Sequence, residues 1–116
     1  MNKIRVLHTV DRFGYGGMER GILKLLNGLD RSRFEPHLLV MRDIDPDVTS
    51  HIAPDVRTFE FQKTEGRNLG LIRQLADYMK TRDIHVVHSH NWGTWFYSQM
   101  AAILAGVPVY IHGEHG

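Results

Sequence analysis

The 116-residue sequence contains no cysteine, which excludes disulfide bonds, thiolate metal sites and cysteine nucleophiles. It also lacks an excess of charge of either sign. Its 14 basic and 13 acidic residues leave a formal net charge of +1, so electrostatics gives no argument for binding nucleic acid. Long apolar runs are absent too, because the most apolar stretch, from Met100 to Ile111, is interrupted by Gly106 and Pro108 and is too short to cross a bilayer.

The amino-terminal end has none of the features of a targeting segment. Residues 1–13 carry charges within an apolar run and lack a small-residue cleavage site, so they predict a strand and not a signal peptide. Apolar residues make up 42% of the chain, which is enough for a packed core in one small domain. We therefore expect a cytoplasmic protein.

Short apolar runs alternate with helical stripes along the chain. The runs predict strands at 4–10, 34–41, 56–61, 84–90 and 107–113. Apolar residues at helical spacing predict helices over 18–29, from an N-cap at Asn68 to about Met79, and over 94–105. The segment 42–55 predicts a loop with one short helical turn. This alternation favours the α/β class, as a Rossmann-like parallel sheet with helices on both faces.

Polar segments follow three of the predicted strands: "DRFGYGGMERG" (11–21), "HSHNWGT" (88–94) and "HGEHG" (112–116). In the usual order of such a sheet these three strands are neighbours, so we expect the segments to converge on one crevice. The glycine loop leads into a helix whose first amides favour an anion such as a phosphate. It lacks the dinucleotide fingerprint, because Glu19 stands at the third glycine position, and a tight turn without a ligand stays open.

Histidines are concentrated at two adjacent strand ends near the carboxyl terminus. His88 and His90 share one face of their strand. This grouping is typical of proton transfer, hydrogen bonding to hydroxyls or a metal site, although "HGEH" is not the helical zinc motif and no metal ligands are assigned. In the nearby aromatic cluster, Trp92 is the better ligand candidate, while Trp95 and Phe96 are predicted to be buried by helix packing.

The segments "HTVDRFGYGGMERGILKLLNGL" and "DIHVVHSHNWGTWFYSQMAAILAGVPVYIHGEHG" resemble the N-terminal domain of family 4 glycosyltransferases. These are GT-B enzymes, in which two Rossmann-like domains face each other across a cleft. Within the family, the chain is most similar to bacterial sugar transferases associated with exopolysaccharide synthesis. The resemblance implies that residues 1–116 are a truncated N-terminal, acceptor-side domain, and that its last elements and the C-terminal donor-binding domain are absent.

The resemblance also implies roles for residues at the three strand ends. Gly16 and Gly17 would bring the helix amides to the diphosphate of a nucleotide-sugar donor and stabilise charge on the leaving group. His115 would contact the donor sugar near the reacting centre, which makes it the implied catalytic residue. The candidate substrate-binding residues on the acceptor side are His90 and Asn91, with Asp11 and Tyr15 beside the opening and Trp92 added from the aromatic cluster.

The sequence therefore predicts a fragment of a retaining glycosyltransferase that transfers a sugar from a nucleotide-sugar donor to a saccharide or lipid-linked acceptor. The nucleotide sugar is a co-substrate, and neither a cofactor nor a metal ion is expected. Two alternatives stay open: a metal-dependent hydrolase or deacetylase that uses the histidines, and a non-catalytic module that binds a phosphate or nucleotide. Peripheral association with the inner face of the membrane and self-association through an exposed apolar edge stay open as well.

Overall fold

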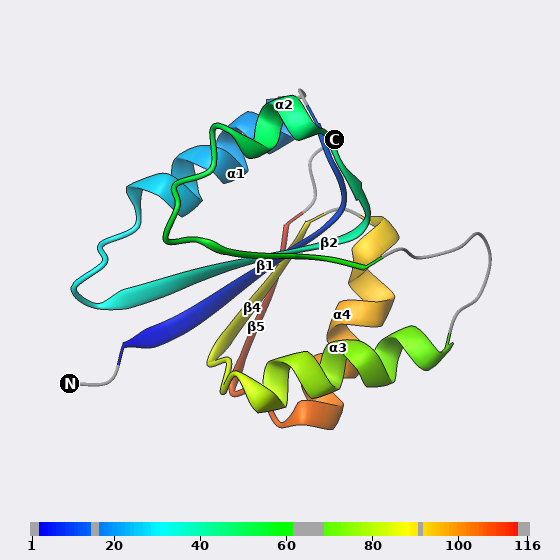
Figure 1. Ribbon diagram of the computed structural model, residues 1–116. Coiled ribbons are helices and arrows are strands. Elements are labelled where there is room, and N and C mark those ends of the chain that lie inside the picture. Colours follow the sequence, from blue (N-terminus) through cyan, green and yellow to red (C-terminus); the bar gives the residue numbers. More distant parts are fainter. Residues whose placement is uncertain (1–2, 15–16, 62–68, 91, 114–116) are drawn as a thin grey trace.

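The computed structural model describes residues 3–14, 17–61, 69–90 and 92–113. Strands and helices alternate through these residues, as the sequence predicts (Figure 1). The strands are β1 (Ile4–Phe13), β2 (Phe34–Ile44), β3 (Arg57–Glu60), β4 (Val86–His90) and β5 (Val109–Gly113). The helices are α1 (Gly17–Gly28), α2 (Pro46–Thr49), α3 (Leu69–Thr81) and α4 (Trp92–Ala105).

The strands form one parallel sheet in the order β3-β2-β1-β4-β5. Helices α1 and α2 cover one face of this sheet, and α3 and α4 cover the other (Figure 1). The predicted Rossmann-like architecture is therefore confirmed. Because the strands are parallel, the carboxyl ends of β1, β4 and β5 lie next to one another at one edge of the sheet.

Each face of the sheet has its own apolar core. On the side of α3 and α4, Leu7 and Val87 of the sheet belong to one cluster with Leu75. On the side of α1, Val10 belongs to a second cluster with Leu26. Successive side chains of a strand point to opposite faces, which distributes the apolar residues of β1 between the two cores. Full burial of a side chain of this size stabilises the fold by about 1.5–3 kcal/mol.

Strands β1 and β2 continue beyond their predicted ends, to Phe13 and Ile44, with a shift in register between Val10 and Arg12. The polar residues Asp11 and Arg12 interrupt the apolar run and conceal this extension from sequence analysis. Phe13 lies beyond them, is only 1% exposed and packs in the core on the α1 side. Burial of one aromatic ring thus accounts for the extra length of β1.

Smaller differences concern the ends of elements. The predicted helical turn is α2, in which the Asp45 side chain caps the helix by accepting a hydrogen bond from the Asp47 backbone N–H at 2.9 Å. β5 begins at Val109 and α4 at Trp92, each two residues from its predicted start. The predicted N-cap Asn68 lies outside the described residues.

The prediction that Phe96 is buried is wrong. Its side chain is 46% exposed, and it belongs to a row of exposed apolar residues on α4 that we call the α4 stripe: Phe96, Met100, Ile103 and Leu104. Trp95 is half-buried, with its ring centroid 6.4 Å from that of His112. Helix α4 is apolar on nearly all sides, so its pattern does not reveal which side faces the sheet.

Candidate functional site

The carboxyl ends of β1, β4 and β5, to which the sequence assigns the candidate site residues, lie together at one edge of the sheet. Helix α1 begins there at Gly17 and helix α4 begins there at Trp92. The Trp92 side chain is outside the description, and so are four whole residues of the predicted site: Tyr15, Gly16, Asn91 and His115. Asp11 and His90 are the predicted site residues whose side chains the structure describes.

Asp11 is held by an arginine of the neighbouring strand. Its Oδ1 accepts a hydrogen bond from Nε of Arg42 at 3.0 Å, and the two side chains are 33% and 25% exposed. This pair joins β1 to β2 where their register shifts. A ligand that approaches Asp11 therefore meets a carboxylate whose charge is partly compensated.

A cavity of about 460 Å³ lies where β1 leads into the glycine loop. Phe13, Gly14 and Ile44 line it, together with Arg12 and Asp43, whose Nε and Oδ1 atoms are 3.4 Å apart. Its volume is within the range of small-ligand sites. The cavity thus adds room for a ligand beside the glycine loop.

His90, the last residue of β4, is buried and is anchored through both its side chain and its backbone. It is 1% exposed, and its Nε2 lies 2.9 Å from Nδ1 of His8 on β1. Its carbonyl oxygen accepts a hydrogen bond from Thr94 Oγ1 at 2.7 Å. These two contacts fix the end of β4 against β1 and against the first turn of α4.

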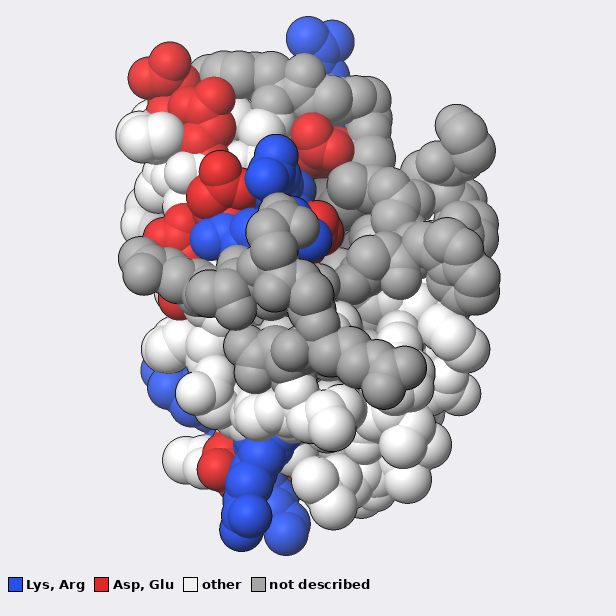
Figure 2. All heavy atoms as spheres, turned by 90° about the vertical axis from the view of Figure 1, so that its right-hand side faces the viewer, with Lys and Arg blue, Asp and Glu red and all other residues white. Residues whose placement is uncertain are grey.

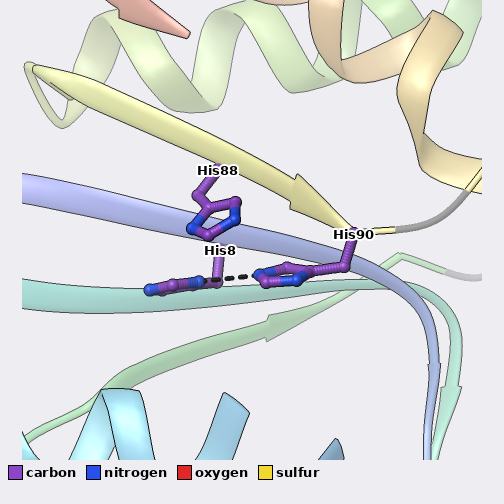
Figure 3. Close-up of side chains that lie close together, drawn as sticks. All are labelled: His8, His88 and His90. Carbon is purple, nitrogen blue, oxygen red and sulfur yellow. Dashed lines mark hydrogen bonds between the residues drawn. The ribbon is translucent and has the colours of Figure 1, made fainter. Parts of the chain in front are cut away.

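Three histidines, His8, His88 and His90, lie together on the face of the sheet that α1 covers, and we call them the histidine cluster (Figure 3). His8 and His88 are register partners on β1 and β4, and His90 follows two residues later on the same face. The ring centroids are 5.1 Å apart for His8 and His88, 4.2 Å for His88 and His90, and 5.2 Å for His8 and His90. One ring nitrogen of each residue lies within 4.8 Å of those of the other two.

Burial keeps His8 neutral at physiological pH. The residue is 4% exposed, and burial, followed by the charge of a protonated His88, lowers the pKa of His8 to about 4. A neutral imidazole has one N–H donor and one acceptor nitrogen. The close contact between His8 and His90 is therefore a hydrogen bond between a donor nitrogen of one ring and an acceptor nitrogen of the other.

The sequence pattern singles out His88 and His90 but misses His8. A histidine inside the apolar run of the first strand gives no signal of its own, and only the register between β1 and β4 reveals its partners. His112, by contrast, is separated from the cluster, because its Nδ1 lies 2.8 Å from Ser89 Oγ on the opposite face of the sheet. The histidines of β4 and β5 therefore do not form one site, contrary to the grouping that the sequence suggests.

On the α4 side of the sheet, a polar network links β4, β5 and α4. Ser89 Oγ lies 2.6 Å from the Tyr110 hydroxyl, which also donates a hydrogen bond to the Trp95 carbonyl at 3.2 Å. Ser89 is fully buried. Its proximity to His112 therefore makes it a structural link and not an accessible nucleophile.

Charge is distributed unevenly over the molecule. From Ile84 to Gly113, a range that includes β4, α4 and β5, the chain has no Asp, Glu, Lys or Arg. Figure 2 shows acidic and basic side chains in the upper left and at the bottom of one face, whereas its lower right shows no Asp, Glu, Lys or Arg. Within the described residues, no helix is both long enough and apolar enough to span a membrane.

Comparison with known proteins gives the family. The sequence matches the description "Glycosyltransferase Family 4" over residues 15–116, which is most of the chain. The chain belongs to Glycosyltransferase Family 4. The fold and the positions of the strand ends agree with this membership.

Two relatives of this family 4 chain are much longer than the chain itself. An Escherichia coli protein described as UDP-Gal:alpha-D-GlcNAc-diphosphoundecaprenol alpha-1,3-galactosyltransferase is 29% identical over 121 residues, which cover 99% of this chain and 30% of that protein. The crystal structure of a glycosyltransferase from Rickettsia africae ESF-5 has a TM-score of 0.77 and 18% identity, and the match covers 97% of this chain and 30% of that one. This second likeness shows a common fold. The chain thus spans less than a third of the length of either relative.

Proposed function

We propose that the protein carrying this chain is a GT-B glycosyltransferase and that residues 1–116 belong to its amino-terminal, acceptor-side domain. The observation that carries the proposal is the family match over residues 15–116, on a parallel sheet in which β1, β4 and β5 end at one edge. We assign donor binding to a second domain in the remainder of the full protein. The family match favours this function over a metal-dependent hydrolase and over a non-catalytic phosphate-binding module.

The proposed reaction transfers a sugar from a nucleotide-sugar donor to a saccharide or lipid-linked acceptor, with retention of anomeric configuration. The name of the Escherichia coli relative supports a lipid-linked acceptor, since it specifies UDP-Gal as donor and a diphosphoundecaprenol-linked GlcNAc as acceptor. With an acceptor of this class, the enzyme works in polysaccharide biosynthesis at the cytoplasmic face of the membrane. The exposed α4 stripe supports a peripheral contact with that surface.

In this proposal the start of α1 faces the diphosphate of the donor. Gly16 and Gly17 lead into the helix, and the first amides of a helix, together with its dipole, favour a negative charge. These amides stabilise the charge that develops on the leaving nucleoside diphosphate. The transfer accordingly needs no metal ion or other cofactor. His115 contacts the donor sugar near the reacting centre.

The acceptor occupies the other side of the same edge. The anchoring of His90 by His8 and by Thr94 fixes the end of β4, and a rigid strand end needs little reordering when the acceptor arrives. The cavity beside Gly14 supports the approach of a ligand to the glycine loop. The proposed acceptor-side residues are Asp11, Tyr15, His90, Asn91 and Trp92.

We also propose that this chain self-associates, and is inactive, when it is produced without the rest of the protein. β5 ends the order of the described sheet, and its Val109 and Ile111 are 44% and 46% exposed. An exposed apolar edge strand readily pairs with another chain. Gel filtration at micromolar concentration should show dimers or larger species, and a clean monomer would contradict this expectation.

The proposed function is tested with the purified full-length protein. It is incubated with nucleotide sugars of different bases and a polyprenyl diphosphate sugar, and both the transferred sugar and the released nucleoside diphosphate are measured. We expect transfer that is insensitive to chelators and a kcat/KM reduced about 100-fold or more by His115→Ala. The control is His51→Gln, which changes an exposed histidine and should leave activity unchanged. Absence of donor consumption, or a strict requirement for a divalent metal, would contradict the proposal.

A further inference from the structure

The three side chains of the histidine cluster are of a type that can ligate a metal ion, and they lie on two neighbouring strands inside the sheet, β1 and β4. β1 lies between β2 and β4, and the register of β1 with β4 sets His8 directly beside His88. His90 projects from the same face as His88, so all three rings lie on one side of the sheet (Figure 3). Ligands carried by paired strands are held more precisely than ligands carried by loops.

The spacing of the His8 and His90 nitrogens is close to that of neighbouring ligands in a tetrahedral metal site. Zinc–nitrogen bonds of about 2.0–2.1 Å at tetrahedral angles separate neighbouring ligand nitrogens by about 3.3 Å. His8 Nδ1 and His90 Nε2 are 2.9 Å apart, and one ring nitrogen of each of the three residues lies within 4.8 Å of those of the other two. The proposed site therefore requires the three rings to rotate so that one nitrogen of each turns toward a common centre.

The chemistry of the ligands selects the class of metal. Imidazole nitrogens suit zinc, copper and nickel, whereas magnesium and calcium prefer oxygen ligands. Imidazole binds a metal in its neutral form. Among the described residues, the metal-ligating side chains that meet here are all imidazoles.

Access to the cluster comes from the side of His88. His8 is 4% exposed and His90 is 1% exposed, whereas His88 is only partly buried. An ion bound by the three rings would therefore be most accessible beside His88. Three histidines with one open position leave room for a bound water molecule, as in zinc sites that are not closed by a fourth protein ligand.

We propose that His8, His88 and His90 form a binding site for one divalent transition-metal ion of the zinc class, with water at the fourth position. The ion would replace the hydrogen bond between His8 and His90 by two metal–nitrogen bonds and would fasten β4 to β1. The proposal concerns binding alone. His90 is also one of the proposed acceptor-side residues, but the metal site does not depend on the transferase function, because the proposed transfer needs no metal.

The test is a cobalt titration of the full-length protein, purified without a histidine tag and stripped with a chelator. Co²⁺ reports its own coordination by visible absorption, and Zn²⁺ should displace it. We expect cobalt binding to this site to saturate at one Co²⁺ per protein chain, with the intense absorption bands of four-coordinate cobalt. Mg²⁺ should not displace the Co²⁺. His88→Gln should weaken binding about 100-fold or more, since even the loss of an outer partner of a metal ligand costs 10–100-fold.

Two controls keep the result interpretable. His51→Gln makes the same substitution at an exposed histidine and should bind cobalt as the native protein does. Thermal unfolding provides a second readout, because Zn²⁺ should raise the Tm of the native protein and of His51→Gln but not that of His88→Gln. Absence of saturable cobalt binding by the native protein, or a cobalt signal that His88→Gln leaves intact, would overturn the proposal.

Discussion

Two buried histidines on neighbouring strands, His37 on β2 and His8 on β1, have contrasting surroundings. His37 is 1% exposed, with its Nε2 2.6 Å from Oε2 of Glu35 and its Nδ1 3.1 Å from the Tyr78 hydroxyl. Both of its ring nitrogens are thus hydrogen-bonded to side chains of other types. His8 instead faces the imidazoles of His88 and His90, which lie on the neighbouring strand β4 and on the same face of the sheet.

Electrostatics separates the two histidines in the same way. Burial lowers the pKa of His37, but the hydrogen bond that the His37 ring donates to Glu35, and the negative charge of Glu35, oppose that effect. At His8, burial lowers the pKa and the positive charge of a protonated His88 lowers it further, to about 4. A carboxylate partner thus characterises His37 as a structural core histidine. A buried histidine that meets other imidazoles is a candidate for binding chemistry instead.

The largest expected effect on stability comes from removing His37, whose two ring nitrogens are both hydrogen-bonded. His37→Ala should lower the free energy of unfolding by roughly 3–4 kcal/mol, because it removes a buried ring and leaves the Tyr78 hydroxyl and Glu35 without this partner. Urea unfolding followed by circular dichroism measures the loss. The exposed His51→Ala is the control and should change stability by less than about 0.5 kcal/mol. A loss below about 1 kcal/mol at His37 would mean that its surroundings are solvated, and the contrast with His8 would fail.

The sequence does not distinguish these two histidines, although it predicts much of the fold. Each lies in an apolar run, "RVLHTV" or "EPHLLV", and local pattern treats both as core positions. What separates them is contributed by distant segments: Tyr78 comes from α3, and His90 comes from β4. Side-chain partners across a sheet depend on register, which a single sequence does not specify.

The same reasoning explains which parts of the site were predictable. Strand order follows from general rules of α/β topology, so the meeting of β1, β4 and β5 could be predicted and is confirmed. The common face of His88 and His90 follows from the alternation of a strand and is also confirmed. The pairing of Asp11 with Arg42 and the exposure of Phe96 could not be predicted, because each depends on how separate elements pack.

A smaller effect should appear in the dependence of stability on pH, measured in chelator so that no metal contributes. Since His8 has a pKa of about 4 in the folded state and 6.5 as its ordinary value, the unfolded state binds more protons between these values. The stability contributed by neutral His8 is thus complete above pH 6.5 and is lost as the pH falls toward 4. From pH 7.5 to pH 5 the loss amounts to about 2 kcal/mol.

Two substitutions test whether His8 causes this loss of stability at acid pH. His8→Asn keeps a polar atom near the position of Nδ1 but does not titrate, so its stability should fall less steeply between pH 7.5 and pH 5. His37→Ala should flatten the same pH dependence by a smaller amount, because Glu35 offsets part of the effect of burial on the His37 pKa. Equal flattening by the two variants would show that the environments are electrostatically alike.

The smallest expected effect isolates one hydrogen bond of His37. Tyr78→Phe removes the hydroxyl that meets His37 Nδ1, but it keeps the ring over which the Arg82 guanidinium lies at 4.1 Å from the centroid. We expect a loss of about 1 kcal/mol in urea unfolding, which is the usual net contribution of one buried hydrogen bond. Cobalt binding should not change, since Tyr78 lies on the opposite face of the sheet from the histidine cluster. A change in cobalt affinity would instead mean that the two buried histidines are coupled through the sheet, and their separate roles would have to be abandoned.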